Sequence, residues 1–158
     1  GGMTANALRH LLLHPAALAA VRADRTLVDA AVEESLRLEP AAARVDRYAT
    51  VDIELVGARI RTGDLVVVSL AAANRDPAVY DDPDAFRLDR PNARTHVAFA
   101  QGPHACLGAQ LARMETRAAI DAVLDRLHDL ELVEPSAVAG TIFRKPVALR
   151  VRWSTSAR

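Results

Sequence analysis

Residues 99–113 read FAQGPHACLGAQLAR and contain the single cysteine of the chain, Cys106. The cysteine comes just before the longest helical pattern, so its sulfur is expected near free backbone N–H groups and the positive end of the helix dipole. Both effects favour the thiolate, which is the form that binds metals. Gly102 and Gly108 flank the cysteine and omit a side chain where the backbone must turn sharply or approach a flat ligand. Cys106 is therefore a candidate metal ligand.

Two further side chains of this segment suit a bound cofactor. Phe99 offers an aromatic face that can shield the sulfur from water, and His104 can direct a hydrogen-bond donor at an anionic group. The competing interpretation is a buried, inert thiol, which is the usual role of a lone cysteine. A nucleophilic cysteine would need a base and a polarising partner, and the sequence carries no cysteine-protease signature.

The order of residues in this segment resembles the heme-binding loop of the cytochrome P-450 family, whose members are heme-thiolate monooxygenases. The residues that carry the resemblance are Phe99, Gly102, His104, Cys106 and Gly108, followed by Leu-Ala-Arg at 111–113. The resemblance implies that these residues bind heme b and that Cys106 is the ligand of its iron. It also implies that Arg47 matches the arginine that usually meets a heme propionate.

Two more signatures resemble bacterial members of this family. Residues 34–37 (ESLR) resemble its Glu-x-x-Arg pair, and residues 74–77 (NRDP) resemble the segment ahead of its long meander loop. In the family the Glu-x-x-Arg pair engages an arginine of the meander, for which we expect Arg90, with Arg87 as the alternative. The resemblance covers nearly all of residues 7–153, so we expect the C-terminal portion of a bacterial cytochrome P-450.

The sequence departs from the family pattern in three ways. Ala100 follows Phe99 where the family usually has glycine. The oxygen-activating helix of the family carries an acid or amide before a threonine, and Thr4 lies too close to Pro15 to take that role, so no catalytic residue is assigned. The segments that precede this helix in the family have no counterpart, so heme would meet protein on one face only, unless another chain covers the second face.

Apolar periodicity predicts helices with a few short antiparallel strands. The expected fold is α+β, mainly α, and the resemblance makes it the C-terminal core of the cytochrome P-450 fold. Helices are predicted at 4–14, 17–24, 27–38 and 107–128, strands within 47–56, 58–70 and 146–153, and a loop at 74–96. Thr26 is the expected N-cap of the third helix. Residues 1–2 fit a cloning remnant ahead of Met3, and residues 3–158 are expected to form one fragment.

Composition narrows the class of partner. Lys plus Arg and Asp plus Glu each total 20, so the formal net charge is zero. A neutral chain without a dense basic run gives no electrostatic sign of nucleic-acid binding, and no apolar stretch is long enough to span a membrane. A single cysteine excludes an intrachain disulfide, which makes a cytoplasmic location the default. The resemblance implies a small organic substrate and a ferredoxin-type electron donor.

The helix predicted at 4–14 carries leucines around much of its circumference, and such a helix needs burial on more than one side. The chain is therefore expected to be a homo-oligomer, most simply a two-fold dimer, or to need a complementing chain. The same helix places His10 and His14 four residues apart. Without a third ligand nearby, this pair is interpreted as a solvated helix face.

Three functional hypotheses remain open at this point. The chain is one part of a heme-thiolate monooxygenase, and thus of an oxidoreductase completed by another polypeptide or a like copy. Alternatively it is a truncated heme-binding or structural protein without oxygenase turnover. A third hypothesis is a domain whose exposed apolar face serves assembly with a partner. The missing acid–threonine pair favours the second and third for the isolated chain, whereas the intact cysteine loop favours retained heme chemistry.

Overall fold

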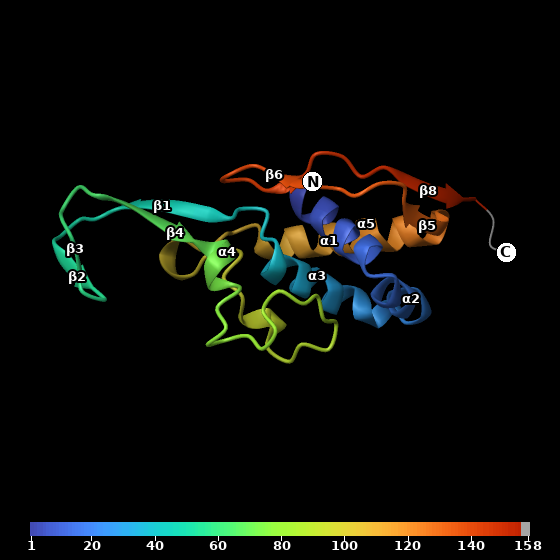
Figure 1. Ribbon diagram of the computed structural model, residues 1–158, viewed down its shortest axis with the longest axis horizontal. Helices are drawn as coiled ribbons and strands as arrows, with labels where there is room; N and C mark the ends of the chain where they lie inside the picture. Colours follow the sequence, from blue (N-terminus) through green and yellow to red (C-terminus); the bar gives the residue numbers. More distant parts are fainter. Residues whose placement is uncertain (156–158) are drawn as a thin grey trace.

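The computed structural model describes residues 1–155 and confirms a mainly helical α+β fold (Figure 1). The helices are α1 (Gly2–Leu13), α2 (Pro15–Ala23), α3 (Val28–Leu38), α4 (Leu70–Ala73) and α5 (Ala109–Arg126), with 3₁₀ turns η1 (Arg25–Leu27), η2 (Ala93–Thr95) and η3 (Gly102–His104). The strands are β1 (Arg44–Tyr48), β2 (Ile53–Leu55), β3 (Ala58–Ile60), β4 (Leu65–Ser69), β5 (His128–Leu132), β6 (Val138–Ala139), β7 (Lys145–Pro146) and β8 (Val151–Ser154).

The hydrophobic core lies where α1, α3 and α5 pack against one another at the centre of the molecule (Figure 1). Each helix turns an apolar stripe inward because its apolar residues recur every three or four positions. The buried members of the core are Ala7, Leu11, Val21, Val28, Ala31, Val32, Leu36, Ala98, Ile120 and Leu124. Ala98 belongs to the segment that leads into the cysteine loop, so the core itself anchors that loop.

The strands described in residues 1–155 pair as four antiparallel two-stranded sheets: β1–β4, β2–β3, β5–β8 and β6–β7. In Figure 1 the first two sheets form an arm that extends away from the helices, while the other two run along the helical core. A two-stranded hairpin is only marginally stable on its own. The arm also leaves apolar side chains exposed, among them Ile53, Leu55 and Leu65.

Several predicted element boundaries are wrong. The strand expected to reach residue 70 ends at Ser69, whose side chain caps the short helix α4 by accepting from the Ala72 N–H. The long helix begins at Ala109 and ends at Arg126, so it is shorter than predicted at both ends. Thr26 is not the helix cap. The Asp24 carboxylate instead accepts from the Thr26 N–H at 2.9 Å and starts the 3₁₀ turn η1.

The leucines of α1 are covered largely by the chain itself. Leu11 and Leu12 are buried and Leu8 is partly buried, whereas Leu13 is 41% exposed. Contacts with α3, α5 and β7 supply the burial that a helix with apolar residues all round requires. The premise that α1 presents these leucines to a partner is therefore wrong for most of them. Among the helices described in residues 1–155, none has the length and apolar character needed to cross a bilayer.

His10 is buried rather than solvated, which corrects the interpretation of the histidine pair. Its Nδ1 lies 2.9 Å from the Ser35 hydroxyl oxygen, and its ring stacks on Phe86 with centroids 5.3 Å apart. Burial, followed by the nearby Arg9 charge, lowers the pKa of His10 to about 3. The sequence did not show this because Phe86 comes from the meander loop, far away along the chain.

Candidate functional site

The loop that carries Cys106 is closed by backbone hydrogen bonds. The Cys106 N–H donates to the Phe99 carbonyl at 2.9 Å, and the Ala105 N–H donates to the Gly102 carbonyl at 3.0 Å. Gly102 has φ +79°, a left-handed conformation that favours glycine. Gly108 is the N-cap of α5, with no side-chain cap, so the helix begins directly after the loop. The Cys106 thiol is exposed, which rules out the interpretation as a buried apolar side chain.

A cavity of about 820 Å³ adjoins this loop. Its volume lies in the usual range for cofactor and ligand sites, about 300–1,000 Å³. Among its lining residues are Ala41, Ala42 and Val45 from the α3–β1 connection and β1, and Phe143 from the turn before β7. The connection after α3 and the turn before β7 thus meet at the cavity, joined by a β-bridge between Ala42 and Phe143.

The structure brings four of the six expected cofactor-binding residues to this cavity: Arg47, Phe99, His104 and Cys106. Gly102 and Gly108 do not line it, and they shape the loop backbone instead. Arg47 lies on β1 with an exposed side chain, and its Nη1 donates to the Asp46 carbonyl at 2.8 Å. An exposed thiol, an apolar wall and a cation on one cavity fit a flat, largely apolar, anionic cofactor such as heme.

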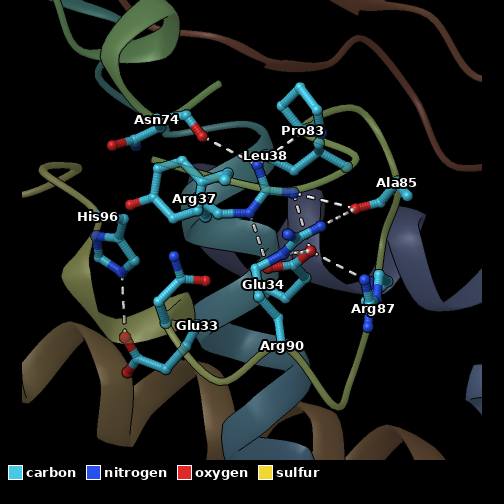
Figure 2. Close-up of polar contacts among 12 residues, drawn as sticks. Glu33, Glu34, Arg37, Leu38, Asn74, Pro83, Ala85, Arg87, Arg90 and His96 are labelled. Atoms are coloured by element: carbon cyan, nitrogen blue, oxygen red, sulfur yellow. Dashed lines mark hydrogen bonds and ion pairs between the residues drawn. The ribbon is translucent and has the colours of Figure 1, made fainter. Parts of the chain in front are cut away.

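Behind the loop, the Glu-x-x-Arg pair holds the meander to the core (Figure 2). Arg37 forms a bidentate pair with Glu34, with Nε–Oε2 at 2.8 Å and Nη2–Oε1 at 2.9 Å, and both side chains are fully buried. Arg37 also donates to the carbonyls of Asn74, Pro83 and Ala85. One ion pair thereby satisfies backbone acceptors of a loop that has almost no secondary structure of its own.

Arg90 is confirmed as the meander arginine of this network. Its Nε donates to Glu34 Oε1 at 2.8 Å, and its other nitrogens donate to the carbonyls of Asp81, Asp82 and Ala85. Arg87, the alternative, offers Glu34 only its backbone N–H (Figure 2). Its side chain pairs with Asp89 instead.

A second buried carboxylate, Glu33, was missed by sequence reasoning. It accepts from Arg113 of α5, with Nε–Oε1 at 2.6 Å. Its Oε2 lies 3.1 Å from His96 Nε2 (Figure 2). Burial favours the neutral acid, but the hydrogen bonds from His96 and Arg113 outweigh it and lower the pKa of Glu33 to about 2. Glu33 is therefore charged at neutral pH. No local spacing signals this cluster, because its members lie 63 and 80 residues from Glu33.

Ala100 and Thr4 bear on the departures from the family pattern. Ala100 adopts φ +57°, a left-handed conformation that costs a residue with a Cβ atom about 1–2 kcal/mol. The Thr4 hydroxyl lies 3.2 Å from that of Thr116 on α5, and Thr4 does not line the cavity. Thr4 thus links α1 to α5.

Comparison with known proteins identifies the family. The protein-family model described as cytochrome P450 matches residues 18–139 of the chain. The chain belongs to the cytochrome P-450 family. It is 44% identical over 156 residues to the cytochrome P-450 monooxygenase PikC of Streptomyces venezuelae, covering 96% of this chain and 37% of that protein. It is 47% identical over 147 residues to 20-oxo-5-O-mycaminosyltylactone 23-monooxygenase of Streptomyces fradiae, covering 87% and 34%.

The fold agrees with solved cytochrome P-450 structures. The substrate-free cytochrome P-450 of Mycobacterium marinum superposes with a TM-score of 0.93 at 34% identity, over 99% of this chain and 41% of that one. Members of this family use heme b as their cofactor. The chain spans about a third of the length of the curated cytochrome P-450 relatives that it matches.

Proposed function

We propose that this chain supplies the cysteine-loop side of a heme-thiolate monooxygenase, in which the Cys106 thiolate would ligate the iron of a bound heme b. The observation that carries the proposal is the exposed thiol on a large cavity whose wall also holds Phe99, His104 and Arg47. A lone cysteine alone would support no such assignment. The assignment of Cys106 as a heme ligand also relies on the family membership and on the buried ion pairs of Glu34 with Arg37 and Arg90 behind the loop.

Each residue of the cavity has a separate task. When bound, heme with a thiolate ligand would supply the chemistry of dioxygen activation, with electrons from an external donor. Cys106 would bind and orient that group, and Phe99 would exclude water from the sulfur. Arg47 and His104 would hold the propionates, because an exposed guanidinium and an imidazole on the same cavity suit two carboxylates. The hydrogen bond from Arg47 to the Asp46 carbonyl is exposed, so water can replace Arg47 there at low cost.

Monooxygenation needs groups that this chain does not contribute. The described residues that line the cavity include no acid–threonine pair. In this proposal the rest of the enzyme, on the same polypeptide or on a complementing chain, would deliver the protons and cover the other side of the cofactor. The partners that fit are a small organic substrate and a ferredoxin-type electron donor, in the cytoplasm. The two Streptomyces relatives are named as monooxygenases, which supports this reaction class.

Titration of the purified chain with heme, followed by absorbance, tests the proposal. We expect saturation at one heme per chain for the wild type and loss of this binding in Cys106→Ala. Val133→Ala is a matched control, because Val133 is exposed and lies outside the cavity. Equal binding by Cys106→Ala and the wild type would refute the assignment of the ligand.

A second candidate, an assembly role without turnover, is favoured by one observation. Leu107, in the turn before α5, and Leu111 and Met114, on the first two turns of α5, are all exposed. Exposed apolar side chains that cluster mark association surfaces. If this role is correct, light scattering at low micromolar concentration shows a homo-oligomer, and heme-loaded protein given a ferredoxin, its reductase and candidate substrates shows no oxygenation.

A further inference from the structure

Phe99 is held by a charge from α5. The guanidinium carbon of Arg113 lies 4.7 Å from the centroid of the Phe99 ring, within the distance of a cation–π contact. Phe99 also lines the cavity beside Cys106, and its carbonyl accepts the Cys106 N–H. The position of this ring and the position of the sulfur are therefore linked through one short loop.

Arg113 is itself fixed by a buried carboxylate. Glu33 is 3% exposed, and it receives two hydrogen bonds from Arg113, at 2.6 Å and 3.2 Å. Arg94 adds a longer ion pair at 3.7 Å from an exposed side chain. A bidentate arginine–carboxylate pair fixes orientation as well as distance. Glu33, on α3, thus fixes the orientation of the Arg113 guanidinium that contacts the Phe99 ring.

His96 closes the same cluster from the other side. The Ala98 N–H donates to His96 Nδ1 at 3.2 Å, so Nδ1 acts as the acceptor and the ring proton sits on Nε2. Nε2–H then donates to Glu33, which leaves the negative charge of Glu33 for the arginines. The centroids of the His96 and Phe99 rings lie 6.3 Å apart, so His96 and Arg113, which both bind Glu33, border the same aromatic side chain.

We propose that Arg113, oriented by Glu33, is a positioning residue that holds the Phe99 ring against the cysteine loop and so sets the surroundings of the Cys106 sulfur. This role rests on the proposed heme-thiolate function, because the ring matters most when the sulfur carries a cofactor. Glu33 and Arg113 bind no substrate and touch no reacting atom. They act through Phe99.

The chain contains a matched control for this role. Arg117 lies one turn further along α5 and pairs with Asp29 on α3 at 2.6 Å, one turn before Glu33. Both arginines therefore connect the same two helices. Arg113 additionally contacts the ring of Phe99. A purely structural role predicts similar effects of Arg113→Gln and Arg117→Gln, whereas a positioning role separates them.

The heme-free protein gives the first readout. The chain has three phenylalanines, so ring-labelled phenylalanine yields few NMR signals, and a Phe99→Leu variant assigns those of Phe99. We expect Arg113→Gln to shift the Phe99 signals and to leave those of Phe86 and Phe143 in place, while Arg117→Gln shifts none. Unmoved Phe99 signals in Arg113→Gln, or equal shifts in Arg117→Gln, would overturn the proposal. Arg113→Lys, which keeps the charge beside Glu33, replaces Arg113→Gln if that variant does not fold.

Heme titration gives the second readout. We expect Arg113→Gln to lower heme affinity about two- to fivefold, as the loss of one partly exposed cation–π contact predicts, and Arg117→Gln to leave it unchanged. Equal affinities for the two variants would overturn the link to the cofactor. If the wild type binds no heme, the proposed function fails, and the NMR comparison still decides whether Arg113 positions Phe99.

Discussion

The two sides of the cysteine loop differ in how many of their polar side chains find partners within the chain. Behind the loop, Glu34, Arg37 and Arg90 are buried and bonded to one another and to meander carbonyls (Figure 2). In front of it, Arg47, His104 and Cys106 are exposed on an open cavity. The supporting side is complete within this chain, whereas the cavity side presents groups that a cofactor can engage. Changes behind the loop should therefore affect folding, and changes in front should affect binding.

The largest effect is expected from Glu34→Ala. Removal of the carboxylate leaves the buried Arg37 and Arg90 without their counter-charge, which typically costs about 3–5 kcal/mol. We expect loss of cooperative thermal unfolding, measured by circular dichroism. Arg87→Ala is the control, because its side chain pairs only at the surface and such pairs contribute about 0–1 kcal/mol. A Glu34→Ala protein that unfolds cooperatively near the wild-type temperature would contradict this account of the supporting side.

Arg47→Ala addresses the cavity side. A hydrogen bond to a charged group contributes about 1.5–3 kcal/mol, so heme affinity should fall about tenfold or more while stability without heme stays the same. Arg59→Ala, on the β2–β3 hairpin outside the cavity, should change neither quantity. An unchanged affinity of Arg47→Ala in a heme titration would exclude a propionate contact.

The lowered pKa of the buried His10 predicts that the free energy of unfolding depends on pH. Its pKa of about 3 in the folded chain lies below the ordinary value of 6.5, so between these values the unfolded chain binds more protons. Stability should therefore fall as the pH drops below 6.5, with His10 contributing up to about 1.4 kcal/mol per pH unit. Urea unfolding at pH 6.5 and 5.5 measures this slope. It should decrease in His10→Gln, and an identical slope in that variant would show that other groups cause it.

Ala100→Gly is expected to have the smallest effect. Relief of the left-handed strain, offset by the greater freedom of glycine in the unfolded chain, should stabilise the protein by about 0.5–1 kcal/mol. Ala105→Gly is the control, because Ala105 has an ordinary φ of −56° and glycine there should only destabilise. Urea unfolding compares the two variants. The same sign of change in both would mean that φ at residue 100 carries no strain.

Motifs with a fixed local spacing could be predicted from the sequence, and contacts between distant segments could not. The cysteine loop and the Glu-x-x-Arg pair are short patterns, and the choice of Arg90 followed from the resemblance. Glu33 and His10 gave no such signal, because their partners Arg113, His96 and Phe86 come from other elements. Burial of a polar side chain depends on what packs over it, which periodicity along one helix does not contain.

The absorption spectrum of the reduced, carbon-monoxide-treated protein tests the central claim most directly. If Cys106 ligates the heme iron, the wild type reconstituted with heme shows the Soret band characteristic of thiolate ligation. Cys106→Ala and Cys106→His lose that band, since no other cysteine exists in the chain to replace the ligand. A wild-type spectrum without the thiolate band, or a Cys106→Ala spectrum identical to that of the wild type, would contradict the account.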